Sequence, residues 1–341
     1  MASLVGAQHI HQDALVIDGL LWYSDGDTRE LHQANVAAFN FTVQFTDVEA
    51  GFEVCLDDIA TWLKIVETED SGWRLVLEAD DILRAREEKR IGVIMGWQNG
   101  RAIGDNLDRL LILHRLGLRI IQLTYNKRNF LADGCLEPND GGLSAFGCEA
   151  VRRMNDLGIA VDLSHCSDRT TIMAAEVSSK PVLITHTCAR AVANWERNRS
   201  DDAMKAVAEN GGVIGVSIYG PIVWDGNPLK RPTIDDFRRN LDHIVDLVGI
   251  EHVGLGTDQY QHTERNAYCQ TLDVAQDNIN PAAAAYSDAF GHTYTTRYPS
   301  DCETIADYPK ITEALACDGW RETDIRAFLG ENFLRAFRVI W

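Results

Sequence analysis

Two histidines occupy equivalent places at the ends of two apolar segments. His165 ends the segment IAVDLSH (159–165), and His186 ends the segment PVLITH (181–186). If these segments are neighbouring parallel strands, the two imidazoles lie side by side at one edge of the sheet. Imidazole is a common zinc ligand, and two adjacent imidazoles are the core of many metal sites. The pair therefore predicts a metal site at this edge.

Polar side chains also end other apolar segments. Asp258 ends HVGLGTD (252–258), Gln98 follows IGVIMGW (91–97), and Tyr125 ends RIIQLTY (119–125). A metal held by two histidines needs a third or fourth ligand, and Asp258 and Gln98 are the nearest candidates by strand order. Without a metal, a tyrosine, two histidines and an aspartate suit acid–base chemistry on a carbonyl group.

The elements that must position these residues alternate regularly along the chain. Eight short, β-rich apolar runs are separated by amphipathic, helix-like segments, and the three runs not yet quoted cover 14–20, 39–45 and 212–219. Such alternation predicts an α/β protein with a closed, TIM-type (β/α)8 barrel, whose chemistry lies at the carboxyl ends of the strands. An open doubly wound sheet is the alternative. It is disfavoured because no glycine-rich phosphate loop follows the first strand.

The end of the chain carries more helix than the last barrel unit requires. Helical patterns continue over 303–341, which predicts a C-terminal helical extension packed on the barrel. The preceding stretch, 259–303, has little pattern, and a loop of that length in a compact domain is usually functional. We found no linker, and expect 1–341 to form a single barrel domain.

The charge composition limits the classes of partner that the protein can bind. The net charge of −19 repels nucleic acid and anionic membrane surfaces, so a small-molecule substrate is the expected partner. Neither a secretory signal nor a run of about 18 apolar residues is present. The eight cysteines include no C-x-x-C pair, which favours reduced thiols and a cytoplasmic location.

Several longer motifs make the sequence similar to a known family. They are, in order, GLSAFGCEAVRRMNDLGIAVDLSHCS (142–167), PVLITHTCARAV (181–192), RNRSDD (197–202), GGVIGVS (211–217), VGLGTD (253–258) and LGENFLR (329–335). Together they resemble the membrane (renal) dipeptidase family, zinc peptidases on an amidohydrolase-like barrel. The resemblance implies a dinuclear zinc site and hydrolysis of a small amide. Members often form dimers, so a homodimer is an open expectation.

The resemblance also implies roles for individual residues. His165 and His186 match the two histidines that hold one zinc in the family. Asp258 matches the aspartate that serves at the other metal and near the attacking water. Arg197, in RNRSDD, matches the arginine that binds the carboxylate of the substrate. Asp133, in FLADG, matches an aspartate of the loop after the fourth strand, and we expect it to contact substrate.

Four positions depart from the family pattern. The His-x-Asp pair that begins the family's site is replaced by Leu20 and Trp22. The glutamate that bridges the two zincs is replaced by Gln98, whose neutral amide is a far weaker ligand. The family's histidine after the fourth strand is Tyr125 here. One of the two zinc sites has therefore lost its ligands, and Trp22 is expected to form an aromatic wall against the substrate.

The remaining residues predict a hydrolase with at most one metal. His165 and His186 would hold one zinc or another divalent ion, with Gln98, Asp258 or water, or no metal at all. Asp258 would act as general base and Tyr125 as hydrogen-bond donor to the oxyanion.

Arg197 would bind an anionic group of the substrate. The predicted reaction is hydrolysis of an amide-type bond in a small, carboxylate-bearing substrate. The alternatives are a metal-independent acid–base lyase or isomerase, and a non-catalytic binding homologue.

Overall fold

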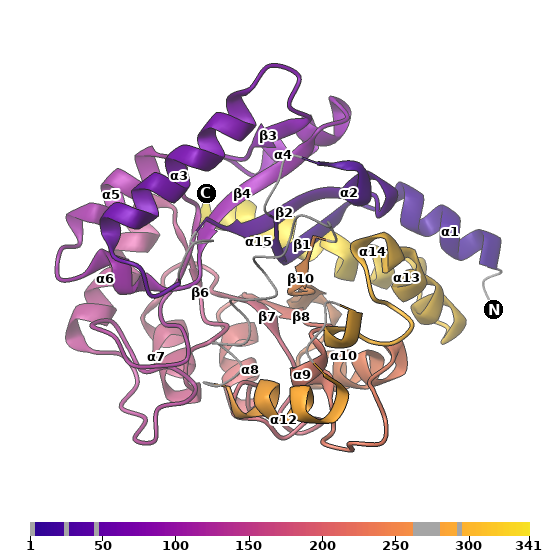
Figure 1. Cartoon of the computed structure of the whole chain (residues 1–341). Helices are drawn as coiled ribbons and strands as arrows, with labels where there is room; N and C mark the ends of the chain where they lie inside the picture. Colours follow the sequence, from indigo (N-terminus) through magenta and orange to yellow (C-terminus); the bar gives the residue numbers. More distant parts are fainter. Residues whose placement is uncertain (1–3, 24–26, 44–47, 262–279, 292–294) are drawn as a thin grey trace.

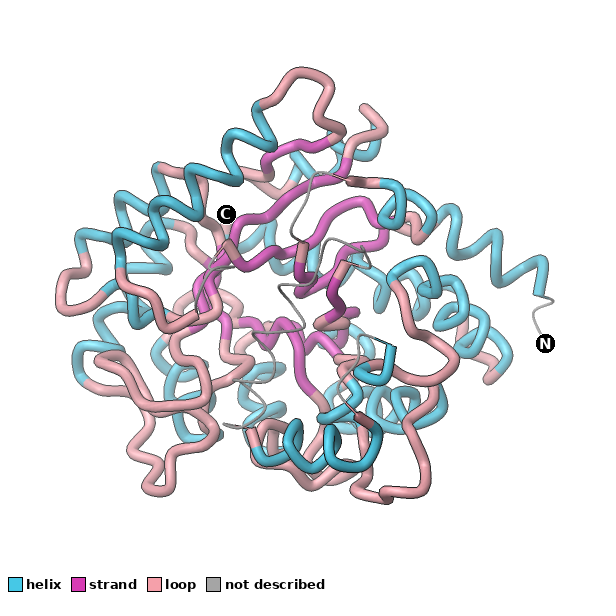
Figure 2. The backbone as a smooth tube through the Cα atoms, in the orientation of Figure 1, coloured by secondary structure: helices cyan, strands magenta, loops and turns pink. Residues whose placement is uncertain are grey.

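Parallel strands form a ring at the centre of the molecule, and helices surround it (Figures 1 and 2). The computed structural model describes residues 4–23, 27–43, 48–261, 280–291 and 295–341. The ring consists of β1 (Val16–Trp22), β2 (Val36–Thr42), β4 (Ile91–Trp97), β5 (Ile120–Gln122), β6 (Ala160–Asp162), β7 (Leu183–Thr187), β8 (Val213–Val216) and β9 (Val253–Leu255).

The strands follow one another around the ring in chain order, and all pairs are parallel. The barrel closes where the chain leaves β9, because the Asp258 amide donates to the Leu20 carbonyl at 3.0 Å. The short β10 (Gln259–Tyr260) then pairs with the end of β1. A further short strand, β3 (Trp73–Leu75), pairs with β4 outside the ring. All carboxyl ends of the strands therefore meet at one mouth.

Helices connect successive strands and cover the barrel. They are α1 (Leu4–Asp13), α2 (Arg29–Gln33), α3 (Phe52–Glu67), α4 (Asp80–Glu87), α5 (Asp108–Arg115), α6 (Ala145–Leu157), α7 (Asp168–Val177), α8 (Asp201–Glu209), α9 (Gly220–Val223), α10 (Ile234–Val248), α12 (Pro281–Phe290), α13 (Tyr308–Cys317), α14 (Glu322–Arg326) and α15 (Asn332–Ile340). Short 3-10 turns lie at Gly100–Ile103, Ile250–His252, Thr295–Arg297 and Ile305–Asp307, and a π-helical turn at Ala327–Glu331.

Three successive helices near the mouth begin in the same way. Ser144, Ser167 and Ser200 cap α6, α7 and α8, each accepting a hydrogen bond from the backbone N–H three residues later. Such caps satisfy amides that a helix start leaves without a partner. The caps fix where each helix begins after its loop.

The C-terminal helix α15 closes the end of the barrel opposite the mouth. Phe333 of α15 packs in one buried cluster with Ile17, Ile94 and Leu183 from three strands. Full burial of such side chains contributes roughly 1.5–3 kcal/mol each. The interior is therefore filled at this end.

Beneath the mouth, neighbouring strands approach β7 unusually closely. A Cβ atom at Gly19, Gly215 or Gly256 would collide with the carbonyl oxygen of Thr185. Because only glycine fits at these three positions, β1, β8 and the end of β9 close tightly around the residue before His186.

The predicted barrel and C-terminal helices are confirmed. The second strand lies at 36–42 rather than 39–45, because the apolar run 36–45 is continuous and does not fix its own ends; residues 44–47 lie outside the described part. β3 and β10 were not predicted. Residues 262–279 and 292–294 of the stretch 259–303 also lie outside the described part, and the single-domain assignment stays a prediction. No helix in the described part is long and apolar enough to cross a bilayer.

Candidate active site

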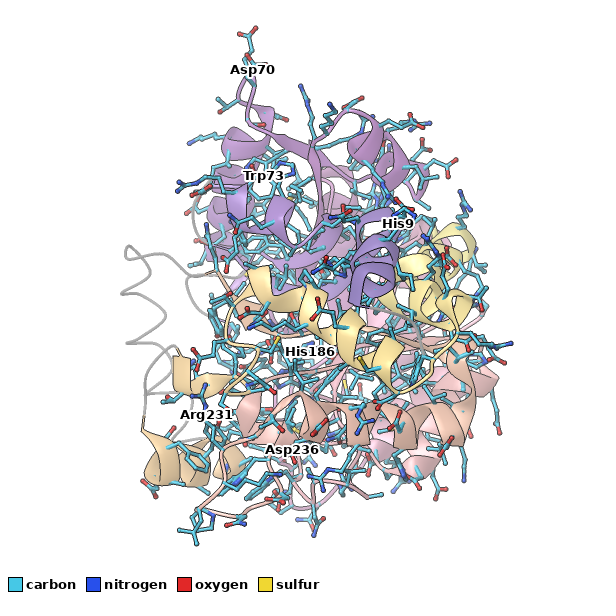
Figure 3. The ribbon with its side chains drawn as sticks, turned by 90° about the vertical axis from the view of Figure 1, so that its right-hand side faces the viewer. His9, Asp70, Trp73, His186, Arg231 and Asp236 are labelled. Carbon is cyan, nitrogen blue, oxygen red and sulfur yellow. The ribbon has the colours of Figure 1, made fainter. Side chains whose placement is uncertain are left out.

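The two predicted histidines lie against each other at the mouth. Nε2 of His165 is 3.1 Å from Nε2 of His186, since β6 and β7 are paired neighbours. His186 is fully buried and His165 is 6% exposed, and Figure 3 places His186 in the interior. The Tyr125 ring stacks on His165 with centroids 4.2 Å apart. His165 therefore faces the open space, and His186 lies behind it.

The other nitrogen of each imidazole is held by a protein group. Nδ1 of His165 lies 2.7 Å from Oδ1 of Asn126, an atom that only accepts. Nδ1 of His186 lies 2.8 Å from Oγ1 of Thr185, and Thr185 donates its own proton to Oδ2 of Asp162 at 2.7 Å. Both Nδ1 atoms therefore carry the hydrogen, so both Nε2 atoms present lone pairs to each other.

Burial, reinforced by nearby Arg197, lowers the pKa of both imidazoles well below the usual histidine value. Both rings are therefore neutral near pH 7. Two facing lone pairs at this distance repel each other, and a shared cation or proton would relieve the repulsion.

Arg197 is anchored beside the histidines. Its Nη1 donates to the Ser164 carbonyl at 2.7 Å, and its Nη2 donates to the His186 carbonyl at 3.0 Å. It is 2% exposed, and burial lowers its pKa. No carboxylate of the described residues lies within ion-pair distance of it. A buried guanidinium without such a partner is suited to bind an anionic ligand.

Asp258 lies across the site, directly after β9. Its φ of 58° is left-handed, a conformation that costs free energy outside glycine and often occurs at functional sites. The indole Nε1 of Trp22 donates to its Oδ1 at 3.1 Å. Burial raises the pKa of Asp258 to about 7, although Arg197 and the indole lower it. The carboxylate can therefore exchange a proton near neutral pH.

The end of β1 presents apolar and aromatic groups. Leu20 is fully buried, and Trp22 stacks on Tyr260 with centroids 5.2 Å and planes 8° apart. This pairing follows from the register in which Trp22 faces Tyr260 across β1 and β10. The two rings form an aromatic wall of the pocket, and contact of Trp22 with substrate stays a prediction.

Gln98 and Tyr125 complete the upper part of the site. Gln98 is 3% exposed, and its Nε2 has no hydrogen-bond partner among the described residues. Burial, and next the charge of Asp258, raise the pKa of Tyr125 above its usual value. The phenol therefore keeps its proton and can donate a hydrogen bond.

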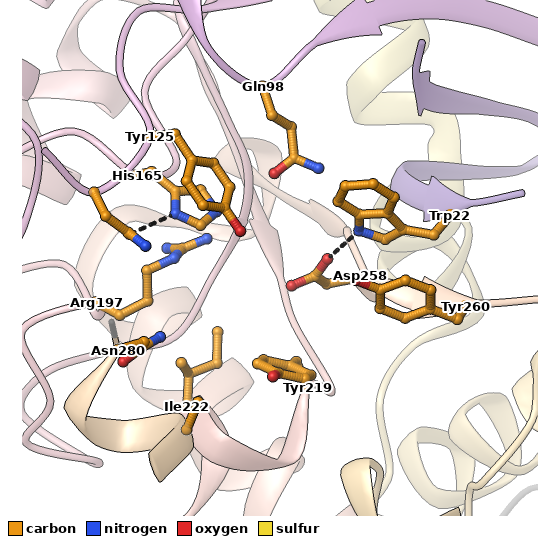
Figure 4. Close-up of a pocket in the computed structure, with 12 residues that line it drawn as sticks. Trp22, Gln98, Tyr125, His165, Arg197, Tyr219, Ile222, Asp258, Tyr260 and Asn280 are labelled. Atoms are coloured by element: carbon orange, nitrogen blue, oxygen red, sulfur yellow. Dashed lines mark hydrogen bonds between the residues drawn. The ribbon is translucent and has the colours of Figure 1, made fainter. Parts of the chain in front are cut away.

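A pocket brings six of the eight predicted site residues together (Figure 4). They are Trp22, Gln98, Tyr125, His165, Arg197 and Asp258. The cavity has a volume of about 40 Å³ and is partly open to solvent. In Figure 4, Arg197 and Trp22 lie on opposite sides, with Asp258 and the Tyr125 hydroxyl between them.

Asp133 does not line this pocket. Its carboxylate pairs with Arg128, whose Nη2 lies 3.0 Å from Oδ2, and it accepts from the Gly141 amide at 2.5 Å. The Arg128 hydrogen bond holds its pKa below the usual range. The structure therefore gives Asp133 a role in its own loop, and substrate contact stays a prediction.

Six lining residues were not assigned from sequence. They are Asn126, Tyr219, Ile222, Tyr260, Asn280 and Ala283. Asn126 carried a usable signal, because asparagine directly after a strand-end residue often adopts the left-handed conformation found here, with φ of 58°. Tyr260, Asn280 and Ala283 belong to the stretch in which no pattern was visible.

Comparison with known families gives one match. The sequence model of the membrane dipeptidase family, peptidase family M19, matches residues 24–265. An uncharacterized dipeptidase, C965.12, of Schizosaccharomyces pombe is 35% identical over 208 residues, 60% of this chain and 50% of that protein. Dipeptidase tcpJ of Claviceps purpurea is 31% identical over 279 residues, 81% of this chain and 57% of that protein. The chain thus spans about half the length of these curated relatives.

Solved structures show the same fold. An amidohydrolase from Pseudomonas aeruginosa superposes with a TM-score of 0.84 at 29% identity, over 98% of this chain and 99% of that one. A metallopeptidase from Rhodobacter sphaeroides, solved with a phosphinate mimic of the dipeptide L-Ala-D-Ala, superposes with a TM-score of 0.77 at 20% identity, over 96% of this chain and 100% of that one.

Proposed function

Because the chain belongs to the membrane dipeptidase family of metallopeptidases, we propose that it hydrolyses an amide-type bond in a small, carboxylate-bearing substrate. One observation carries this proposal: a buried arginine without an anionic partner in the described part, Arg197, shares a pocket with Asp258, whose pKa is about 7. One group can hold the substrate's carboxylate while the other moves a proton.

Arg197 orients the substrate. Two of its N–H groups are fixed on the Ser164 and His186 carbonyls, so the remaining N–H groups are held in one direction and can bind the substrate carboxylate in bidentate fashion. Binding this end places the scissile carbonyl between Asp258 and Tyr125, which lie between Arg197 and Trp22 in Figure 4.

Asp258 and Tyr125 carry the proton chemistry. Ionised Asp258 removes a proton from water as the water oxygen bonds to the carbonyl carbon. The Tyr125 hydroxyl donates a hydrogen bond to the oxygen on which negative charge develops. The proton held by Asp258 then passes to the leaving nitrogen as the C–N bond breaks, which yields a carboxylic acid and an amine.

The donors available support at most one metal. The converging Nε2 lone pairs of His165 and His186 fit one divalent cation, which when bound would polarise the carbonyl and lower the pKa of water. The other half of the family's centre does not fit, because Leu20 has no donor atom and Trp22 spends its N–H on Asp258. Among the described residues, no group of three or more His, Cys, Asp or Glu side chains is arranged for a metal.

A second candidate is a metal-independent lyase or isomerase. The observation that favours it is the Trp22 N–H bonded to Asp258, at the carboxylate that serves a metal in the family. With the indole in that place, Asp258 and Tyr125 form an acid–base pair that needs no metal.

Metal content and turnover test these proposals together. We expect elemental analysis of the purified chain to find at most one divalent metal, lost in His186→Ala. Two tightly held metals per chain would overturn the proposed site. A metal-free chain whose turnover resists chelators would favour the acid–base alternative.

Turnover is measured by chromatography of products from dipeptides and N-acylated amino acids. Arg197→Met should lower kcat/KM by about 100-fold or more, since it removes a charged hydrogen-bond donor in a desolvated site. Arg152→Met is the matched control, because Arg152 pairs with Glu149 on the exposed face of α6. Equal activity of both variants would refute the assigned role of Arg197.

A further inference from the structure

The half of the pocket that carries no metal ligands has a chemistry of its own. Leu20, Trp22 and Gln98 stand where the family resemblance places the second metal's ligands. Of these three, Trp22 and Gln98 line the pocket, and an indole and a neutral amide suit an uncharged group instead of a cation.

The aromatic wall favours a flat partner. Trp22 and Tyr260 both line the pocket and stack nearly parallel, with planes 8° apart. The indole N–H is already used on Asp258, which fixes the ring's orientation. Each ring uses one face on the other, so another planar group of low polarity would pack against the outer face or the edges of the pair.

Gln98 adds a hydrogen-bond donor beside this wall. Its Nε2 is buried and lacks a partner in the described part of the chain, and Figure 4 shows the amide between Tyr125 and Trp22. Buried polar groups normally have a partner. A carbonyl oxygen of the ligand would supply one here, and the amide donor would distinguish that carbonyl from groups that cannot accept.

The charges disfavour an ammonium group. Among the described lining residues, Asp258 is the one carboxylate and Arg197 the one guanidinium. The lining therefore offers no surplus negative charge that would hold a positively charged amine near the wall.

We propose that the pocket selects N-acylated amino acids with a flat, uncharged acyl group over dipeptides with a free α-ammonium group. The substrate carboxylate binds Arg197, the acyl carbonyl accepts from Gln98, and the planar acyl group packs against the ring pair of Trp22 and Tyr260. This assignment rests on the proposed hydrolysis only for the identity of the bond cleaved, because binding alone already expresses the preference.

Two matched compounds test the preference. N-(Phenylacetyl)glycine and phenylglycylglycine share one skeleton, except that the second carries an α-ammonium group. Isothermal titration calorimetry on the full chain at pH 7.5 should give a Kd for the first compound at least tenfold lower. A Kd ratio of one, or a preference for the dipeptide, would overturn the proposal.

Variants at Gln98 assign the preference to this side chain. Gln98→Glu restores a carboxylate and should reduce or invert the Kd ratio, while Gln98→Met should weaken both compounds by about tenfold, because both carry the acyl carbonyl that accepts from the amide. Gln33→Glu, at an exposed position of α2, is the charge-matched control and should leave the ratio unchanged. Thermal unfolding checks that each variant is folded. A Kd ratio unaffected by Gln98→Glu, together with Kd values unaffected by Gln98→Met, would refute the role of the amide.

Product analysis separates this proposal from the proposed hydrolysis. If the preference is measured but neither compound is cleaved, the hydrolase proposal fails and the binding specificity stands. If both compounds are cleaved and bind equally well, hydrolysis stands and the specificity is refuted.

Discussion

Two sides of the barrel mouth are built on the same scaffold but carry different chemistry. We define the histidine side as Asp162, Ser164, His165, Thr185 and His186, and the tryptophan side as Asp18, Leu20, Trp22, Thr257 and Asp258. On the histidine side, Asp162 accepts hydrogen bonds from the Ser164 amide and from both the amide and hydroxyl of Thr185.

On the tryptophan side the same pattern recurs. Asp18 accepts from the Leu20 amide at 2.9 Å, from the Thr257 amide at 3.0 Å and from the Thr257 hydroxyl at 2.7 Å. In both cases the threonine directly precedes a site residue, His186 or Asp258. Each buried aspartate therefore joins two strands and fixes the backbone from which the site's side chains project.

The difference between the sides lies only in what the scaffold presents. One side presents two imidazoles, whereas the other presents Leu20 and Trp22 and adds the Tyr308 hydroxyl to its aspartate at 2.5 Å. The backbone supports are thus separable from the chemistry, since the same aspartate–threonine clamp lies under imidazoles on one side and under Leu20 and Trp22 on the other. The separation can be tested on each side independently.

The largest expected effect, on the free energy of unfolding, comes from removing the aspartate of either aspartate–threonine clamp. Asp162→Ala and Asp18→Ala each remove the acceptor for four donors, and each should lower the free energy of unfolding by about 3–4 kcal/mol. Only Asp162→Ala should also shift the His186 ring resonances, because Thr185 holds Nδ1 of that ring. Urea unfolding and NMR measure the two effects.

Asp156→Ala is the control for these variants, since Asp156 is exposed on α6. Loss of stability on one side only would show that the two clamps are not equivalent. A shift of His186 resonances in both variants would contradict the independence of the two sides.

The barrel and the strand-end site residues could be predicted from the sequence, whereas the aspartate–threonine clamps could not. The β-rich runs predicted the barrel, because apolar strands buried on both faces leave a strong pattern. They also placed His165, His186 and Asp258 at strand ends, and the structure brings these ends to one mouth. The clamps were not predicted, since a buried Asp18 or Asp162 looks like any polar residue until its neighbouring strand is known.

Other parts of the site were not accessible from sequence for a different reason. Tyr260 enters the pocket through a two-residue strand, and Asn280 and Ala283 through a helix that follows a long stretch without periodicity. Nothing local in such a stretch indicates which residues return to the mouth. Asp133 illustrates the opposite case, because its family match was visible but its partner, Arg128, was not.

A smaller effect is expected when Asp258 loses its charge. Burial raises the pKa of Asp258 to about 7 in the folded chain, above the unfolded value of about 3.9. Folded-state stability from this group is therefore present at low pH and is lost as pH rises through about 7. Asp258→Asn removes that loss and should stabilise the chain at pH 8 by about 1–2 kcal/mol, a discounted value because Asp258 is partly exposed.

The same variant should be inactive, so stability and turnover move in opposite directions. Thermal unfolding at pH 5 and pH 8 measures the gain, which should be larger at pH 8. Asp156→Asn serves as the surface control. An equal gain in stability at both pH values would show that ionisation of the Asp258 carboxyl group does not destabilise the folded chain.

The smallest effect isolates the hydrogen bond that the Trp22 indole of the aromatic wall donates to Asp258. Trp22→Phe keeps a ring at the wall but removes the N–H that Asp258 accepts. Because this bond lowers the pKa of Asp258, its loss should raise that pKa by about one unit or less. The rising limb of the rate against pH should then move to higher pH, with little change in its plateau.

Trp195→Phe is the matched control, since Trp195 donates to the Trp224 carbonyl outside the candidate catalytic groups and should leave the limb in place. The indole resonance of Trp22, assigned by its absence in Trp22→Phe, reports the same titration without any substrate. It should shift with a midpoint near pH 7 in the wild-type chain and stay constant in Asp258→Asn. If the indole resonance does not change with pH in either chain, Trp22 only packs against Tyr260. The carboxyl group of Asp258 would then not exchange a proton near neutral pH on the tryptophan side.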